Sequence, residues 1–123
     1  MYQLEAKKNG NALSVQIGGE LLMPDMVDFM ARMEELCATE GVVQIVLDTT
    51  GLKRMDPAGL GVIVSLSTRT QSRGRRIVLL RSGPLLQKLL QDAEIEGFFP
   101  TCESEEELRG YIPEATGARQ GTR

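Results

Sequence analysis

The sequence predicts a single α/β domain, with a mixed β-sheet of about five strands and about four helices. Two aliphatic runs, VVQIVL at 42–47 and IVLL at 77–80, have the composition of strands that are buried on both faces of a sheet. Segments with helical periodicity follow these runs, and strands joined through helices favour parallel pairing. At 123 residues, the chain is long enough to bury one hydrophobic core.

The chain begins with a predicted β-hairpin. Residues 2–8 and 12–17 alternate between apolar and polar side chains, and Asn9-Gly10 supplies the positive-φ residues of a tight turn. The first helix is expected at 24–39, because apolar residues recur there at offsets of three and four. These residues are Met26, Phe29, Met30, Met33 and Cys37. We interpret this stripe as core rather than as a methionine-rich binding groove.

A central strand and a second helix follow. The strand is expected at 42–50, and the helix begins after it with Asp56 as N-cap and Pro57 at the first helical position. Proline is well placed there because the missing N–H would have no helical partner. The helix is expected to run to about Arg73, where Gly74 can end it.

The last third of the chain is predicted to add a helix at 84–91 and a fourth helix at 104–111, with Thr101 or Glu103 near its start. Phe98 and Phe99 between them fit a short last strand or its approach. Residues 113–123 contain no apolar side chain larger than alanine. We therefore expect a domain at 1–112 and a disordered C-terminal tail at 113–123.

The segment MDPAGLG at 55–61 is the candidate binding site, because it joins a buried strand to a helix through residues that leave the backbone accessible. The expected partner-binding residues are Asp56, Pro57, Ala58, Gly59, Leu60 and Gly61. A glycine inside a helix costs about 0.5–1 kcal/mol relative to alanine. Two glycines within one turn therefore need a reason, which is either close approach of a partner or close packing against the protein's own sheet.

The composition argues against an enzyme. The chain has no histidine, which removes the commonest general base and the commonest metal ligand. The acidic run Glu103, Glu105, Glu106 and Glu107 has the pattern of a solvated helix face. No glycine-rich phosphate loop with its lysine is present. We expect no catalytic residues, no metal and no cofactor.

The run IVLDTTGLKRMDPAGLGVIVSL at 45–66 resembles the STAS family, the domain of bacterial anti-sigma factor antagonists and of the cytoplasmic tails of sulfate transporters. The matching residues are Leu47, Asp48, Met55, Asp56, Gly59, Leu60 and Gly61. Gly19-Glu20-Leu21 is similar to the family's Gly-Glu-Leu-Asp before the first helix, with Leu22 in place of the aspartate. More loosely, the resemblance extends from residue 2 to about residue 112, and the family's order of strands and helices agrees with the one predicted above.

The sequence departs from the family at Pro57 and Ala58. In the antagonists, the residue after the aspartate is the serine that a partner kinase phosphorylates, and here that position is Pro57. The resemblance therefore implies a non-catalytic, protein-binding regulatory module whose usual phosphorylation switch is absent. Its implied partner is an anti-sigma factor of the serine-kinase class. The alternatives are an accessory subunit bound to a transporter ATPase and a scaffold subunit that assembles with other STAS subunits.

Charge and cysteine content narrow the setting. A net charge of -3 gives no overall attraction to nucleic acid, and we interpret Arg69, Arg73, Arg75 and Arg76 as a helix-end cluster rather than a nucleic-acid patch. No signal peptide and no apolar run of membrane-spanning length is present. Together with two widely separated cysteines, these features predict a cytoplasmic protein without direct membrane insertion.

Overall fold

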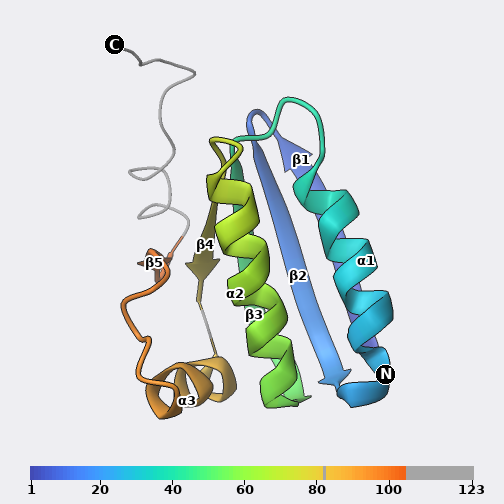
Figure 1. Cartoon of the computed structure of the whole chain (residues 1–123), viewed down its shortest axis with the longest axis vertical. Coiled ribbons are helices and arrows are strands. Elements are labelled where there is room, and N and C mark those ends of the chain that lie inside the picture. Colours follow the sequence, from blue (N-terminus) through green and yellow to red (C-terminus); the bar gives the residue numbers. More distant parts are fainter. Residues whose placement is uncertain (82, 105–123) are drawn as a thin grey trace.

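The computed structural model describes residues 1–81 and 83–104, which form a five-stranded sheet with helices on one face (Figure 1). The strands lie in the order β1-β2-β3-β4-β5, with β1 antiparallel to β2 and every other pair parallel. The predicted α/β class and mixed sheet are thus confirmed. The described residues contain three α-helices rather than about four. Apart from Ser104, the helix expected at 104–111 and the tail expected at 113–123 lie outside the described residues.

The first two strands form the expected hairpin. Strand β1 spans Tyr2–Asn9 and β2 spans Ala12–Leu21, so that a two-residue loop connects them. The turn differs from the prediction in one respect. Gly10 has a φ of 65°, whereas Asn9 is the last residue of β1 and has no positive φ. Glycine alone supplies the left-handed conformation of this turn.

The segment expected as one helix at 24–39 is divided in two. A short 3-10 helix, η1, spans Met23–Asp25, and the α-helix α1 spans Met26–Cys37. Phe29, Met33 and Cys37 of α1 are buried in the main core and Met26 packs against it, which confirms the interpretation as core for these four residues. Met30 is half-buried and does not belong to this cluster.

Strand β3 spans Gln44–Met55 and is longer than the strand expected at 42–50. Its final residues, 51–55, lie beyond the predicted end of the strand. They stay in the sheet because β2 continues beside them to the pair Leu21 and Met55, with register shifts on the way. One shift places two residues of β3, Thr49 and Thr50, opposite Ile17, which is a β-bulge.

The remaining elements alternate as predicted. Helix α2 spans Pro57–Gln71, β4 spans Arg76–Leu80, α3 spans Pro84–Asp92 and β5 spans Thr101–Cys102. Phe98 and Phe99 form the approach to the last strand rather than the strand itself. Thr101 belongs to β5 and not to the start of a helix.

One main core lies between the helices and the sheet. Buried side chains from all three helices, including Phe29, Leu60 and Leu86, pack in it with Ile45 and Leu47 of β3. Alternate residues of β3 and β4 face the other way, and Val46, Val78, Leu80 and Cys102 form a second, smaller cluster there. The two central strands are therefore buried on both faces, as the aliphatic runs predict.

Candidate functional site

The predicted binding segment forms a tight junction between β3 and α2. Asp56 is the N-cap of α2, and its Oδ1 accepts a hydrogen bond of 2.9 Å from the backbone N–H of Ala58. The backbone N–H of Asp56 donates to the carbonyl of Leu21 at 2.8 Å. The cap is thus fixed both to its own helix and to the end of β2, which confirms the capping role expected of Asp56.

The six predicted site residues divide between surface and core. Pro57 and Gly61 are exposed, whereas Asp56 and Ala58 are half-buried. Gly59 and Leu60 are buried, and Leu60 belongs to the main core. A partner at this junction would therefore meet the exposed side of the first helical turns and not all six side chains.

The two glycines of α2 have different surroundings. A Cβ at Gly59 would lie 2.8 Å from Cε of Met55 and 3.2 Å from Cδ2 of Leu21. At Gly61, an added Cβ would have no atom within 4 Å. Close packing on the sheet thus accounts for Gly59, whereas the structure gives no packing reason for Gly61.

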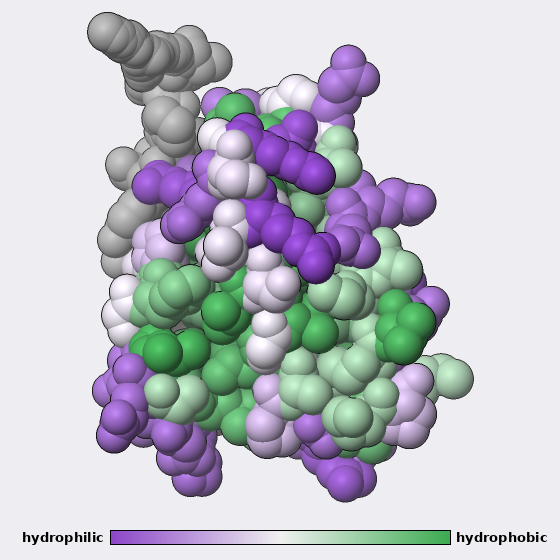
Figure 2. Space-filling model, viewed as in Figure 1, coloured by the Kyte–Doolittle hydropathy of each residue, from purple (hydrophilic) through white to green (hydrophobic). Residues whose placement is uncertain are grey.

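Exposed apolar side chains lie at the same end of the molecule. Met23 of η1 is 59% exposed and Val27 of α1 is 85% exposed. Both residues follow the end of β2 in the chain. Leu21, the last residue of β2, contacts Asp56 and Gly59 and so holds this end beside the start of α2. Figure 2 shows hydrophobic residues gathered over the middle and lower part of the helical face, with hydrophilic residues over its upper part and at its lower left edge. We call the surface formed by Met23, Val27, Pro57 and Gly61 the docking surface.

The departure from the family pattern at Leu22 is compensated locally. Leu22 occupies the N-cap position of η1, where its side chain makes no capping hydrogen bond. Oδ2 of Asp25 instead accepts a hydrogen bond of 3.0 Å from the backbone N–H of Leu22. The turn that presents Met23 is therefore held without the family's aspartate.

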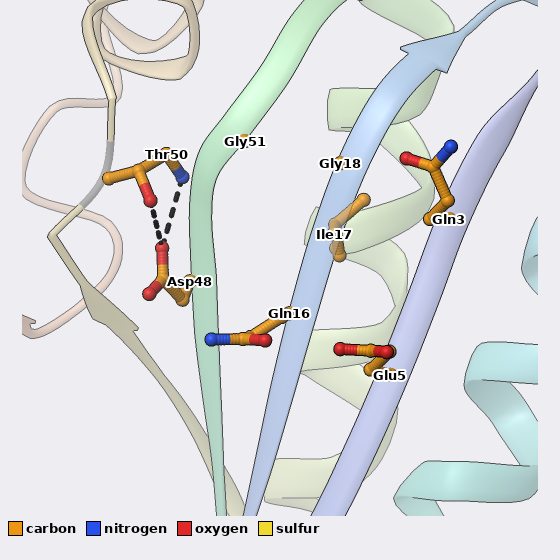
Figure 3. A pocket seen from close by; sticks show the side chains of 8 residues that line it. All are labelled: Gln3, Glu5, Gln16, Ile17, Gly18, Asp48, Thr50 and Gly51. Carbon is orange, nitrogen blue, oxygen red and sulfur yellow. Dashed lines mark hydrogen bonds between the residues drawn. The ribbon is translucent and has the colours of Figure 1, made fainter.

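A polar hollow that no local sequence pattern predicts lies on the sheet face away from the helices (Figure 3). It has a volume of about 400 Å³. Gly18 and Gly51, which are paired across β2 and β3, form part of its floor because neither carries a side chain. The remaining lining residues are Gln3, Glu5, Gln16, Ile17, Asp48 and Thr50. The glycines were visible in the sequence, but only the strand register brings them together.

Asp48, beside this hollow, is held by its neighbours. Its Oδ1 accepts hydrogen bonds from the Thr50 backbone N–H at 3.0 Å and the Thr50 hydroxyl at 2.7 Å. Its Oδ2 lies 3.3 Å from a guanidinium nitrogen of Arg81. Burial opposes ionisation, but these hydrogen bonds and the charge of Arg81 outweigh it, so that the pKa of Asp48 is lowered. A carboxylate stabilised in this way is a poor general base.

The described residues contain no cluster of three or more His, Cys, Asp or Glu side chains that could hold a metal ion. Cys37 and Cys102 are buried, and burial raises the pKa of the Cys37 thiol to about 11. A thiol with this pKa is protonated at neutral pH and is a weak nucleophile. Among residues 1–81 and 83–104, no helix is long and apolar enough to cross a membrane.

Three of the four arginines of the cluster, Arg69, Arg75 and Arg76, have structural partners. Arg69 forms an ion pair with Glu34, and Arg75 donates hydrogen bonds of 2.7 Å to the carbonyls of Cys37 and Thr39. Arg76 donates to the side chain of Gln44 at 3.3 Å. These contacts connect the end of α2 to α1 and the sheet, which agrees with the interpretation as a helix-end cluster.

This fold, with its capped junction between β3 and α2, is that of a STAS domain. The model of the STAS domain family matches residues 3–108, and the chain therefore belongs to this family. A comparison with curated proteins gives no match.

Three proteins are among the similar solved structures. The first is the unphosphorylated form of the anti-sigma factor antagonist SpoIIAA of Bacillus, with 21% identity and a TM-score of 0.71 over 91% of this chain and 99% of that one. An anti-sigma factor antagonist from Mycobacterium paratuberculosis has 13% identity and a TM-score of 0.72, over 89% and 93%. A variant of RsbS from Moorella thermoacetica has 18% identity and a TM-score of 0.69, over 88% and 93%. At these identities, the likeness establishes the fold.

Proposed function

We propose that this chain is a non-catalytic regulatory module that binds a partner protein through the docking surface at the start of α2. The observation that carries the proposal is the exposure of Pro57 and Gly61 at the end of the molecule where the exposed apolar residues Met23 and Val27 also lie (Figure 1). Apolar groups that gather at one end of a domain are typical of a surface that a partner covers.

The chemistry of the junction supports binding rather than catalysis. Its one carboxylate, Asp56, is occupied in capping α2, and Pro57 and Ala58 provide neither nucleophile nor base. The junction offers a rigid helix start, because the cap fixes the backbone. Its proline, alanine and glycine residues also have little side-chain entropy to lose on binding.

The proposed partner is an anti-sigma factor of the serine-kinase class, and the proposed place of action is the cytoplasm. The support is the family membership together with the fold shared with proteins described as anti-sigma factor antagonists. Binding to the docking surface would compete with the sigma factor for the same anti-sigma factor.

Pro57 favours a complex without the usual switch. It is exposed at the first position of α2, where the resemblance implies a phosphorylated serine, and it has no hydroxyl. The same property would suit a permanent subunit of a transporter ATPase, which is therefore the second candidate partner. Purification of the tagged chain from its own cells, with identification of the co-eluting protein, distinguishes the two.

Gly61→Gln tests the docking surface, because it should change folding and binding in opposite directions. The glutamine side chain would enter open space, and glutamine forms helices better than glycine does. The free energy of unfolding should therefore rise by about 0.5 kcal/mol. The same side chain should obstruct a partner and weaken binding about tenfold or more, measured by titration calorimetry with the purified partner.

Thr68→Gln is the matched control, since it lies two turns further along the exposed side of α2. It should leave the affinity unchanged. If Gly61→Gln binds as tightly as the wild type, the partner does not cover this surface and the proposed binding site is wrong.

A further inference from the structure

Strand β1 leaves a long edge of the sheet open. It has eight residues and pairs with β2 on one side, and no strand among residues 1–81 and 83–104 pairs with its outer side. The opposite edge strand, β5, has only two residues. Figure 1 shows β1 at the border of the sheet beside α1. An exposed edge of this length is a template for pairing with another strand.

The backbone groups on this open edge can be assigned from the strand register. Asn9 and Ala12 flank the two-residue loop and therefore form a hydrogen-bonded pair. The carbonyl of Met1 accepts a hydrogen bond of 2.9 Å from the N–H of Glu20 in β2. Odd-numbered residues of β1 thus point their backbone groups toward β2. Leu4, Ala6 and Lys8 point theirs outward, because the direction alternates along an antiparallel strand.

The charged side chains of β1 select one partner and one register. We propose that the chain forms a symmetric dimer in which β1 pairs antiparallel with β1 of a second copy, with Ala6 on the two-fold axis. Ala6 then pairs with Ala6, and Leu4 pairs with Lys8, all through outward backbone groups. Glu5 of each copy lies opposite Lys7 of the other, in the closer, non-hydrogen-bonded position.

Neighbouring registers of the β1–β1 pair are unfavourable either for the backbone hydrogen bonds or for the charges. A shift by one residue does not align the outward backbone groups. A shift by two residues places either Glu5 opposite Glu5 or Lys7 opposite Lys7 across the axis. Like charges directly opposite each other destabilise a strand pair. The register centred on Ala6 is the one that satisfies both the backbone and the charges.

The two charges are available for this pairing. The side chains of Glu5 and Lys7 are exposed and make no hydrogen bond or ion pair with other described residues. Figure 3 shows Gln3 and Glu5 on the helix-free face of the sheet, where Lys7 follows by strand alternation. Charged edge residues commonly prevent pairing, but this pattern is repulsive in the shifted registers and attractive in one.

Sedimentation equilibrium of the full chain at low ionic strength tests the proposal through charge reversal. The wild type should dimerise in a concentration-dependent way. Glu5→Lys alone and Lys7→Glu alone should each weaken dimerisation about tenfold or more, because two attractive pairs become repulsive. An equal mixture of these two variants should form a dimer as stable as that of the wild type, because the lysine at position 5 of one variant faces the glutamate at position 7 of the other, and Lys7 of the first faces Glu5 of the second.

Glu96→Lys and Lys53→Glu are matched charge controls away from the edge and should dimerise like the wild type. Ala6→Pro removes an outward N–H without breaking the β1–β2 ladder and should give a folded monomer. A wild type that stays monomeric at the highest concentration reached would overturn the proposal. So would a mixture that fails to regain the dimer, because another strand or surface would then be responsible.

Discussion

At the residue scale, Gly59 differs from Gly61 although both lie in the first turns of α2. Gly59→Gln should destabilise the fold by about 1–3 kcal/mol, because the added atoms meet Met55 and Leu21 in a packed interior. Chemical denaturation in urea measures this change. The contrast with the stabilising change at Gly61 is the control, and a Gly59 variant as stable as the wild type would mean that the sheet does not restrict this position.

Asp48 gives the domain a predicted dependence on pH. Its pKa is lowered in the folded protein because hydrogen bonds from Thr50 and the charge of Arg81 outweigh burial. A lowered folded pKa stabilises the protein above the unfolded pKa, which is about 3.9 for aspartate, and this stabilisation is lost as the pH falls toward the folded pKa. Asp48→Asn should cost about 1–2 kcal/mol at neutral pH and less near pH 3.

Urea denaturation of both proteins at the two pH values measures the difference. Asp92→Asn is the control, because its ion pair with Lys88 is exposed and should contribute little at either pH. A cost of Asp48→Asn that stays constant from neutral to acidic pH would contradict the electrostatic explanation and indicate a loss of packing instead.

At the element scale, local chemistry in the sequence predicted the starts of helices better than the ends of strands. Asp56 and Pro57 predicted the start of α2 because capping depends on residues next to each other in the chain. The end of β3 could not be predicted in this way. Residues 51–55 are polar enough to suggest a linker, and they remain in the strand because β2 pairs with them.

The candidate site was predicted only in part for the same reason. Residues 56–61 form a recognisable local pattern, whereas Met23 and Val27 lie about thirty residues earlier in the chain. They reach the start of α2 through the contacts of Leu21 with Asp56 and Gly59. Likewise, the hollow over Gly18 and Gly51 depends on a strand register that no local pattern reveals.

At the scale of the whole molecule, the helices and the open edge divide the surface into separate regions. The docking surface lies on the helical layer, where η1, α1 and α2 begin together (Figure 1). The proposed dimer uses the backbone edge of β1 and side chains on the opposite face of the sheet. Charge reversal at Glu5 or Lys7 should therefore change self-association without altering affinity for the partner per folded chain, which separates the two proposals experimentally.

Pro57 should leave the whole complex without a phosphorylation switch. With the proposed kinase partner and ATP, the wild type should gain no phosphate at the start of α2 and should stay bound. Pro57→Ser should be phosphorylated and released, because a phosphate adds about -1.5 to -2 charges to a surface that the partner covers. The fold should tolerate the change, since serine is acceptable in a first helical turn and the Asp56 cap bonds to Ala58 rather than to residue 57.

Pro57→Ala is the matched control, because it removes the ring without adding a hydroxyl and should remain bound. Mass spectrometry and size-exclusion chromatography of each mixture measure phosphate and binding. Phosphate on the exposed Thr50 or the half-buried Ser65 of the wild type, with loss of the partner, would mean that the switch uses another hydroxyl. Thr49 is a poorer candidate, because it is only 2% exposed.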